Sequence, residues 1–308
     1  MKKLLIIGIT AIFSIFAVAC SSETNTTTNQ SKENTTLKSA TEVVKKAKEK
    51  SSTMKGDSYT EQYKLEHTFQ SEAEDGMPIN FTNVRIHKYE HDRIFKPYAE
   101  RIIGQYQSSF KINIKGYKDD GGDTNTFEQE EYRVNGKIYY KTKEDKEWTV
   151  SPMGKVSPSF RLKFLDELIK INNDKNIKMT QENGLYKLVF DKTYFNENKQ
   201  LFDFYKKGWP FQHPTDFVEG KLKKDSGQTI LYDQAQFKNP VIEIWVDQNN
   251  FMIKKFSIVS SIRIPTVSTE KGKDGKTKVF PPFYIEEQWS AETKNEFTGS
   301  INLPAGVK

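Results

Sequence analysis

The sharpest catalytic candidate in the sequence is the segment His87-Lys88-Tyr89-Glu90-His91, which contains two histidines and a glutamate. The segment matches H-x-x-E-H, a pattern in which two histidines bind zinc and the glutamate acts on the zinc-bound water. This chemistry requires a helix, because histidines four residues apart then share one face. His87, Glu90 and His91 are therefore weak candidates for a metal site.

The residues around this motif favour a strand. From Ile79 onward, side chains alternate between the two faces with a period of two, and no apolar stripe of helical period accompanies them. On a strand, His87 and His91 lie about 13 Å apart at ~3.3 Å per residue, and Glu90 points to the opposite face. We therefore predict no metal here and interpret the histidines as solvent-facing strand residues near a bend.

Other catalytic constellations lack their parts. The chain has four histidines and one cysteine, and the remaining histidines, His67 and His213, lie near no cysteine in the sequence. The sequence contains no G-x-S-x-G elbow, no P-loop and no dinucleotide fingerprint. We expect a protein without enzymatic activity and without a cofactor.

The one cysteine, Cys20, closes an export signal. Lys2 and Lys3 precede a short apolar run, which ends in the small residues 17–19 directly before Cys20. This arrangement is typical of a secretory signal, and the cysteine at the cleavage point resembles a bacterial lipobox. The resemblance implies that residues 1–19 are removed as a lipoprotein signal peptide and that Cys20 is diacylated, palmitate being a typical acyl chain.

The residues after Cys20 predict a flexible tether. Residues 21–36 contain no apolar side chain, so they cannot bury enough surface to offset the entropy of ordering. About sixteen such residues span roughly 20 to 25 Å. We expect residues 20–38 to hold a folded domain at the outer face of the bacterial cytoplasmic membrane, with membrane lipid as the partner of the anchor.

The charge of the chain does not indicate nucleic-acid binding. The 308 residues include 47 lysines and arginines against 41 aspartates and glutamates, and the two signs are mixed along the sequence. A nucleic-acid interface needs a concentrated basic patch, usually with arginines. We predict no nucleic-acid partner, and the sequence identifies no protein partner.

Residues 39–308 read as one domain, rich in long antiparallel strands. Ser39 and Glu42 form a capping box at the start of a first helix, and Asn135-Gly136 predicts a tight hairpin. A second helix is expected after Ser157, with Pro158 in its first turn. The strands are expected at Tyr59–Phe69, Ile79–Tyr89, Phe110–Tyr117, 132–134, 137–140, 148–150, Leu185–Phe190, Val241–Val246, Phe251–Ile264 and Phe283–Thr293. The expected fold class is α+β: a large curved antiparallel sheet, or half-barrel, with two or three helices on its concave face.

This order of elements resembles the LolA/LppX-like superfamily of bacterial lipoproteins, including its uncharacterised Gram-positive members. The residues that carry the resemblance are EEYRVNGKIYYKTKEDKEWTV at 130–150, GLYKLVFD at 184–191, IEIWVDQNNFMIKKFSIVSSI at 242–262 and NEFTGSINLPAGVK at 295–308. The resemblance covers roughly residues 39–308, although the segment 191–240 has no counterpart. It implies a half-barrel that wraps around helices and encloses an apolar cavity.

The segment 191–240 is an insertion rich in aromatic residues. Eight aromatic residues fall between Tyr194 and Phe217. Such a cluster either packs the insertion onto the sheet or forms a lid over an apolar cavity, and both arrangements bury it. The residues that would line the cavity come from this insertion and from the second helix: Phe160, Phe164, Leu165, Leu168, Phe202, Tyr205, Trp209 and Phe211.

Two functions follow from these observations. In the first, the lipid-anchored half-barrel binds an apolar or acylated ligand, such as a lipid. In the second, it is a non-enzymatic interaction protein of the cell envelope, whose core is filled by its own side chains. A zinc hydrolase that uses the H-x-x-E-H segment is a remote third.

Overall fold

Long antiparallel strands make up most of the structure, which is a computed structural model. It describes residues 39–72, 78–114, 124–155, 159–208, 228–230, 234, 236–271, 277–304 and 307. The predicted signal peptide, Cys20 and the tether lie outside the described residues, as do Trp209 and Phe211. Among the described residues, no helix is long and apolar enough to cross a membrane.

The described residues form a single 12-stranded antiparallel sheet. Its strands are β1 (Gly56–Glu72), β2 (Pro78–Phe95), β3 (Tyr98–Ile114), β4 (Thr124–Val134), β5 (Lys137–Thr142), β6 (Thr149–Pro152), β7 (Lys178–Glu182), β8 (Leu185–Phe190), β9 (Gln228–Ile230), β10 (Gln236–Asp247), β11 (Ile253–Lys271) and β12 (Thr277–Glu296). In space their order is β6-β5-β4-β3-β2-β1-β12-β11-β10-β8-β7, with β9 paired to β11. The path begins at β6 and ends at β7, so the sheet is open, as predicted for a half-barrel.

Local sequence explains the connections. Asn135 and Gly136 have φ angles of 53° and 75° in the turn between β4 and β5, which confirms the predicted hairpin. The turn between β10 and β11 also uses a side chain, because Asp247 accepts hydrogen bonds from the backbone N–H groups of Asn249 and Asn250. No strand was expected at β7, at β9, at residues 98–109 of β3 or at residues 124–131 of β4.

Four helices are described, one more than the upper expectation. They are α1 (Ala40–Thr53), α2 (Phe160–Ile171), α3 (Lys192–Glu197) and α4 (Lys199–Gly208). Ser39 caps α1 as predicted, its hydroxyl accepting from the N–H of Glu42 at 3.2 Å. The cap of α2 is Ser159 and not Ser157, which lies outside the described residues. The last two helices arise in a segment expected to be irregular, where Asp191 caps α3.

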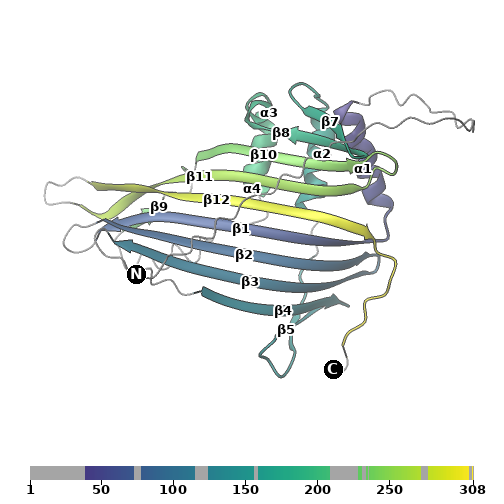
Figure 1. The fold of residues 1–308 in the computed structure, drawn as a ribbon, viewed down its shortest axis with the longest axis horizontal. Helices are drawn as coiled ribbons and strands as arrows, with labels where there is room; N and C mark the ends of the chain where they lie inside the picture. The colour runs from purple at the N-terminus through teal and green to yellow at the C-terminus, as the bar shows by residue number, and fades with distance from the viewer. Residues whose placement is uncertain are drawn as a thin grey trace, which may run out of the picture. The chain divides into compact units, whose positions relative to one another are not determined.

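The helices cover only one part of the sheet. Figure 1 shows α1 to α4 gathered at the side of β7, β8 and β10, and none of these four described helices is stacked on β3 to β5. We call the face on which the helices pack the inner face. Apolar side chains of β8, β10, β11, β12 and β1 on this face form one core with the helices. Burial of this shared apolar surface positions the helices and leaves most of the inner face of β2 to β5 without a described helix, although Met153, Gly154, Lys155 and Ser159 line a pocket there.

Candidate functional site

The inner face changes character where β1 meets β2. On the helix-covered side it is almost entirely apolar, with Ile242, Ile244, Phe256, Ile258, Ile262, Phe283 and Ile285 all at most 1% exposed. On β2 the inner-facing residues are Asn83, Arg85, His87, Tyr89, His91 and Arg93. We call the inner face of β1 to β5 the polar trough. None of the six β2 residues has an aliphatic side chain. This part of the inner face therefore differs from the apolar part against which the helices pack.

Strand register arranges the polar trough in cross-strand rows. Residues directly opposite one another in an antiparallel pair share a face and lie side by side. From β1 to β4, four successive rows are Tyr63–His87–Tyr106–Phe127, Glu61–Tyr89–Gly104–Gln129, Tyr59–His91–Ile102–Glu131 and Asp57–Arg93–Glu100–Arg133. The charged groups therefore concentrate at one end of the trough and the aromatic rings in its middle.

Two adjoining pockets occupy the polar trough. A pocket of about 550 Å³ lies over the charged rows, with Glu61, His91 and Glu100 among its lining residues. A second pocket of about 600 Å³ lies over the middle and far part, lined by Asn83 and Phe110 among others. Tyr106 lines both pockets and so stands at their boundary.

Tyr106 is held in place by its aromatic neighbours and by a glycine. Its ring stacks on Phe127, with centroids 4.4 Å apart and an interplanar angle of 7°, and meets Tyr89 edge to face at 5.4 Å. A Cβ atom added at Gly104 would lie 2.8 Å from the Tyr106 ring. The absence of a side chain at Gly104 thus lets the ring fold over the sheet.

His91 is a buried titratable residue of the polar trough, and only one of its two ring nitrogens is hydrogen-bonded to a described residue. Its side chain is 9% exposed, and Nδ1 lies 3.1 Å from Oε1 of Glu100. Because a carboxylate accepts a hydrogen bond, this contact assigns the proton to Nδ1. Nε2 has no hydrogen-bond partner among the described residues, and the nearest carboxylate oxygen, on Glu61, is 3.8 Å away.

Glu100 is the charged centre of this network. Burial alone would raise the pKa of its carboxyl group. Hydrogen bonding and charge from His91, the charge of Arg133 and a hydrogen bond from the Tyr98 hydroxyl outweigh burial and lower the pKa to about 2. Arg133 also donates to Glu131. The carboxylate is therefore ionised at neutral pH although Glu100 is only 2% exposed.

An ion pair connects the trough to α2. Arg93 donates two hydrogen bonds to Asp57, at 3.0 and 2.8 Å. From α2, the Arg161 guanidinium lies 4.0 Å from Asp57 and 4.7 Å from the Tyr59 ring centroid. Burial raises the pKa of Tyr59 well above its ordinary value, more than the nearby arginines lower it. This phenol is therefore neutral and acts as a packing surface for Arg161.

The H-x-x-E-H segment lies within β2, which confirms that it forms a strand. His87 and His91 face the trough and Glu90 faces outward, where it lies 3.6 Å from Lys294. In the part of the chain that the structure describes, no three His, Cys, Asp or Glu residues are placed to hold a metal ion. The interpretation of the histidines as solvent-facing is wrong for His91, because Tyr59 and Glu100 cover it.

The residues predicted to line an apolar cavity lie together in the hydrophobic core. Phe160, Phe164, Leu165, Leu168 and Tyr205 are buried in the cluster that α2 and α4 form with the sheet, and Phe202 packs against it. Aromatic contacts join them, such as Phe160 to Phe164 at 5.8 Å and Phe202 to Tyr205 at 6.3 Å. A ligand-lining role for these residues stays a prediction, and Trp209 and Phe211 lie outside the described residues.

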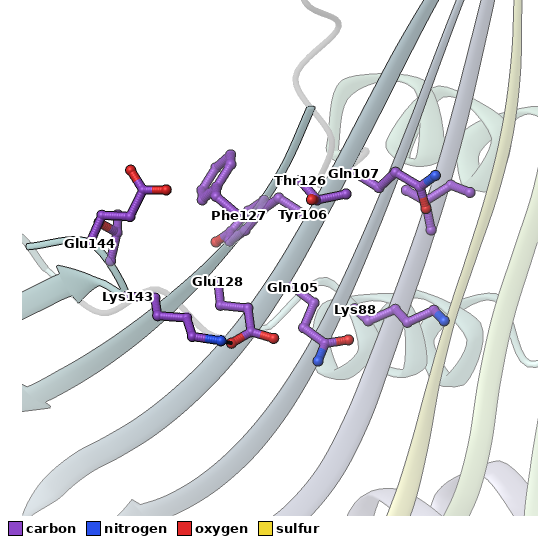
Figure 2. A pocket seen from close by; sticks show the side chains of 11 residues that line it. Lys88, Gln105, Tyr106, Gln107, Thr126, Phe127, Glu128, Lys143 and Glu144 are labelled. Atoms are coloured by element: carbon purple, nitrogen blue, oxygen red, sulfur yellow. Dashed lines mark ion pairs between the residues drawn. The ribbon is translucent and has the colours of Figure 1, made fainter. Parts of the chain in front are cut away.

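A third pocket, of about 470 Å³, opens beside Tyr106 and Phe127. Figure 2 shows Lys88, Gln105, Glu128 and Lys143 in a row across neighbouring strands. Residues 88, 105, 128 and 143 are exposed, and the closest approach of the Lys143 ammonium to Glu128 is 3.7 Å. An exposed ion pair of this kind contributes little stability, so it does little to hold the two side chains in fixed positions. The polar trough, with its buried network, is therefore the better candidate site.

The polar trough was not predicted as a site from the sequence. Its residues alternate along β2 and β3, which indicated strands, but alternation does not show which face a helix will cover. The one available signal was the type of residue: His91, Arg93 and Glu100 alternate with other polar residues rather than with a clean apolar face.

Comparisons with known proteins assign no family. No family model and no curated protein matches the chain. Among solved structures, it is similar to a DUF1329 family protein from Desulfovibrio piger, with 9% identity over 85% of this chain and 96% of the other, at a TM-score of 0.20. It is also similar to a β-barrel-like protein of domain family DUF1849 from Brucella abortus, with 9% identity over 79% of this chain and 100% of the other, at a TM-score of 0.17. At these TM-scores neither likeness carries an argument about this chain.

Proposed function

We propose that this protein is an exported, lipid-anchored ligand-binding protein without enzymatic activity, whose half-barrel receives its ligand in the polar trough. Cys20 would hold it at the outer face of the bacterial cytoplasmic membrane. The observation that carries the proposal is the pair of adjoining pockets, about 550 and 600 Å³, on the part of the inner face that the described helices leave open. Each falls in the range of roughly 300 to 1,000 Å³ that is usual for small-molecule sites.

The residues that line the two pockets support a binding role for the polar trough. Tyr89 and Tyr106 combine apolar ring faces with polar edges, and Ile102, in the row next to that of Tyr89, is 7% exposed in the floor of the pocket at the charged end. The ion pairs of Glu100 and Arg93 preorganise the charged end. The LolA/LppX-like resemblance by itself favours an apolar ligand or a lipid, whereas the polar and charged rows of the trough favour a ligand that carries polar groups.

A second function is favoured by the filled core under the helices. Phe164, Leu165 and Tyr205 are completely buried against neighbouring side chains. This agrees with an envelope interaction protein whose core needs no ligand. In that case the polar trough would stay empty of small molecules during purification.

Native mass spectrometry of the full chain, purified from its membrane in detergent, separates the two. We expect a retained ligand mass that is lost in Tyr106→Ala, because this substitution removes the ring shared by both pockets. Tyr284→Ala is the matched control, since Tyr284 is 40% exposed on the outer face of β12. If the parent protein, incubated with membrane extract, retains no added mass, the ligand-binding function is wrong and the interaction function is favoured.

A further inference from the structure

We propose that the polar trough takes an uncharged, hydroxyl-rich chain, an oligosaccharide, as its ligand. The inference rests on the proposed function, because it names the chemical class that the trough would recognise. Three properties of the trough carry it: buried polar atoms without partners among the described residues, arginines at its charged end that are already paired, and aromatic rings flanked by polar side chains.

Buried polar atoms argue against an acyl chain. Oδ1 of Asn83 and Nε2 of His91 are buried and have no hydrogen-bond partner among the described residues. Asn83 lines one pocket and His91 the other. Both atoms are already closed off from water, and an unpaired buried polar group costs about 1 to 3 kcal/mol, which an apolar ligand would not relieve. A ligand hydroxyl that reaches either atom can both donate and accept, so it supplies the partner that each atom lacks.

The existing ion pairs argue against a charged ligand. Arg133 binds both Glu100 and Glu131, and Arg93 binds Asp57. A phosphate or carboxylate on a ligand would compete with these carboxylates for the same guanidinium groups. Removing one partner of a buried pair leaves the other charge uncompensated, which is costly. An uncharged ligand bonds to the outer edges of the network and leaves the pairs intact.

The middle of the trough matches the two surfaces of a sugar ring. Its C–H face is apolar and can lie against Phe127, which stacks on Tyr106 and is 49% exposed. Its hydroxyl edges can reach the polar rows on either side. In these rows Ser108 lies opposite Asn125, and Gln129 follows two residues after Phe127. Aromatic faces with amides and hydroxyls at their margins suit a polyhydroxylated ring better than a hydrocarbon chain.

The length of the trough indicates a chain-like ligand. The pairing of its backbone excludes a ligand that binds as an added β-strand. Asn83 and Arg93 are ten residues apart on β2, which spans roughly 33 Å. The floor strands β2 and β3 pair with neighbours on both sides over this length. An extended peptide binds best by pairing with an exposed strand edge. The trough offers side chains only, so an oligosaccharide of several units is favoured over a peptide.

The test is isothermal titration calorimetry of the full, detergent-solubilised chain. The ligands are neutral hexasaccharides of glucose, mannose, galactose and N-acetylglucosamine. Palmitic acid is titrated in parallel. We expect at least one hexasaccharide to bind, with an affinity that falls about tenfold or more in Tyr106→Ala. Asn83→Leu should weaken the same hexasaccharide and not palmitic acid, while Tyr284→Ala should change neither.

The outcomes distinguish a failure of the oligosaccharide inference from a failure of the proposed ligand-binding function. Binding of palmitic acid that Tyr106→Ala abolishes, without hexasaccharide binding, overturns the oligosaccharide and keeps a ligand-binding trough. Hexasaccharide binding that Tyr106→Ala leaves unchanged also overturns the inference, because the contact then lies elsewhere. If no hexasaccharide and no palmitic acid binds, both the inference and the proposed function lose their support.

Discussion

The imidazole ring of His91 lies parallel to the phenol ring of Tyr59, with centroids 4.2 Å apart and an interplanar angle of 5°. This stack joins β1 to β2 in the floor of the polar trough. Tyr59 contacts Arg161 of α2 on one side, and His91 contacts Glu100 on the other. Because these contacts link α2 to Glu100 through Tyr59 and His91, the position of α2 helps to fix the positions of these trough side chains.

Glu100→Gln should change how stability depends on pH. The Glu100 pKa is about 2 in the folded protein against an ordinary 4.5, so its charge stabilises the fold above pH 4.5. That stabilisation, on the order of 3 kcal/mol, is lost as the pH falls from about 4.5 to 2. Urea denaturation at pH 7 and pH 3 should show a smaller loss of stability on acidification in the variant than in the parent chain.

The control for this prediction is Glu128→Gln, which removes an exposed carboxylate next to Lys143 on the same sheet. It should leave the difference in unfolding free energy between pH 7 and pH 3 close to that of the parent chain. Equal acid sensitivity in Glu100→Gln and the parent would show that the His91–Glu100–Arg133 network does not stabilise the fold.

Gly56→Ala and Gly104→Ala should differ sharply although both place a methyl group in the sheet. At Gly56 the new Cβ would lie 2.2 Å from the backbone oxygen of Arg93, which cannot move without breaking the pairing of β1 and β2. We expect a loss of at least about 2 kcal/mol in denaturant unfolding. At Gly104 the Cβ would meet only the end of the Tyr106 side chain.

Gly104→Ala should therefore cost less than about 1 kcal/mol while displacing the Tyr106 ring. In proton NMR spectra, the Tyr106 ring resonances should lose the upfield shift that stacking on Phe127 produces. An unchanged Tyr106 spectrum, together with full stability, would mean that the glycine does not set the position of the ring.

Much of the fold was predictable because its signals are local. The Ser39 cap of α1 and the Asn135-Gly136 turn each act within a few residues, and the structure bears both out. The trough was not predictable, since its chemistry depends on which half of the sheet the helices cover. That outcome depends on apolar side chains as distant as Val43, Phe164 and Ile285 packing together.

The same limit applies to His91. From the sequence, a histidine among alternating polar residues reads as solvent-facing. Its burial comes from Tyr59, 32 positions earlier, and from Glu100, which reaches it only because β2 and β3 pair in one register. A shift of one residue in that register would turn Glu100 to the outer face.

Phe164→Ala should destabilise the protein by about 3 to 5 kcal/mol, because Phe164 is completely buried against Phe190 and Phe256. Phe127→Ala removes the same ring from a site that is 49% exposed, and should change stability by about 0.5 kcal/mol or less. Thermal and urea unfolding measure both. A Phe164→Ala protein as stable as the parent would indicate that the core beneath α2 is loose enough to admit a ligand.

Cys20→Ser should release the protein from membranes and leave the folded domain unchanged. The predicted diacyl modification requires the cysteine thiol, and two acyl chains give stable anchoring where one gives only marginal binding. We expect the parent in the membrane fraction and the variant in the soluble fraction, with identical circular dichroism spectra for the folded domain. Ser21→Ala is the matched control, because it changes the adjacent residue and keeps the thiol. A Cys20→Ser protein that stays with the membrane would place the attachment elsewhere, and the surface of the half-barrel would then be the first place to search for it.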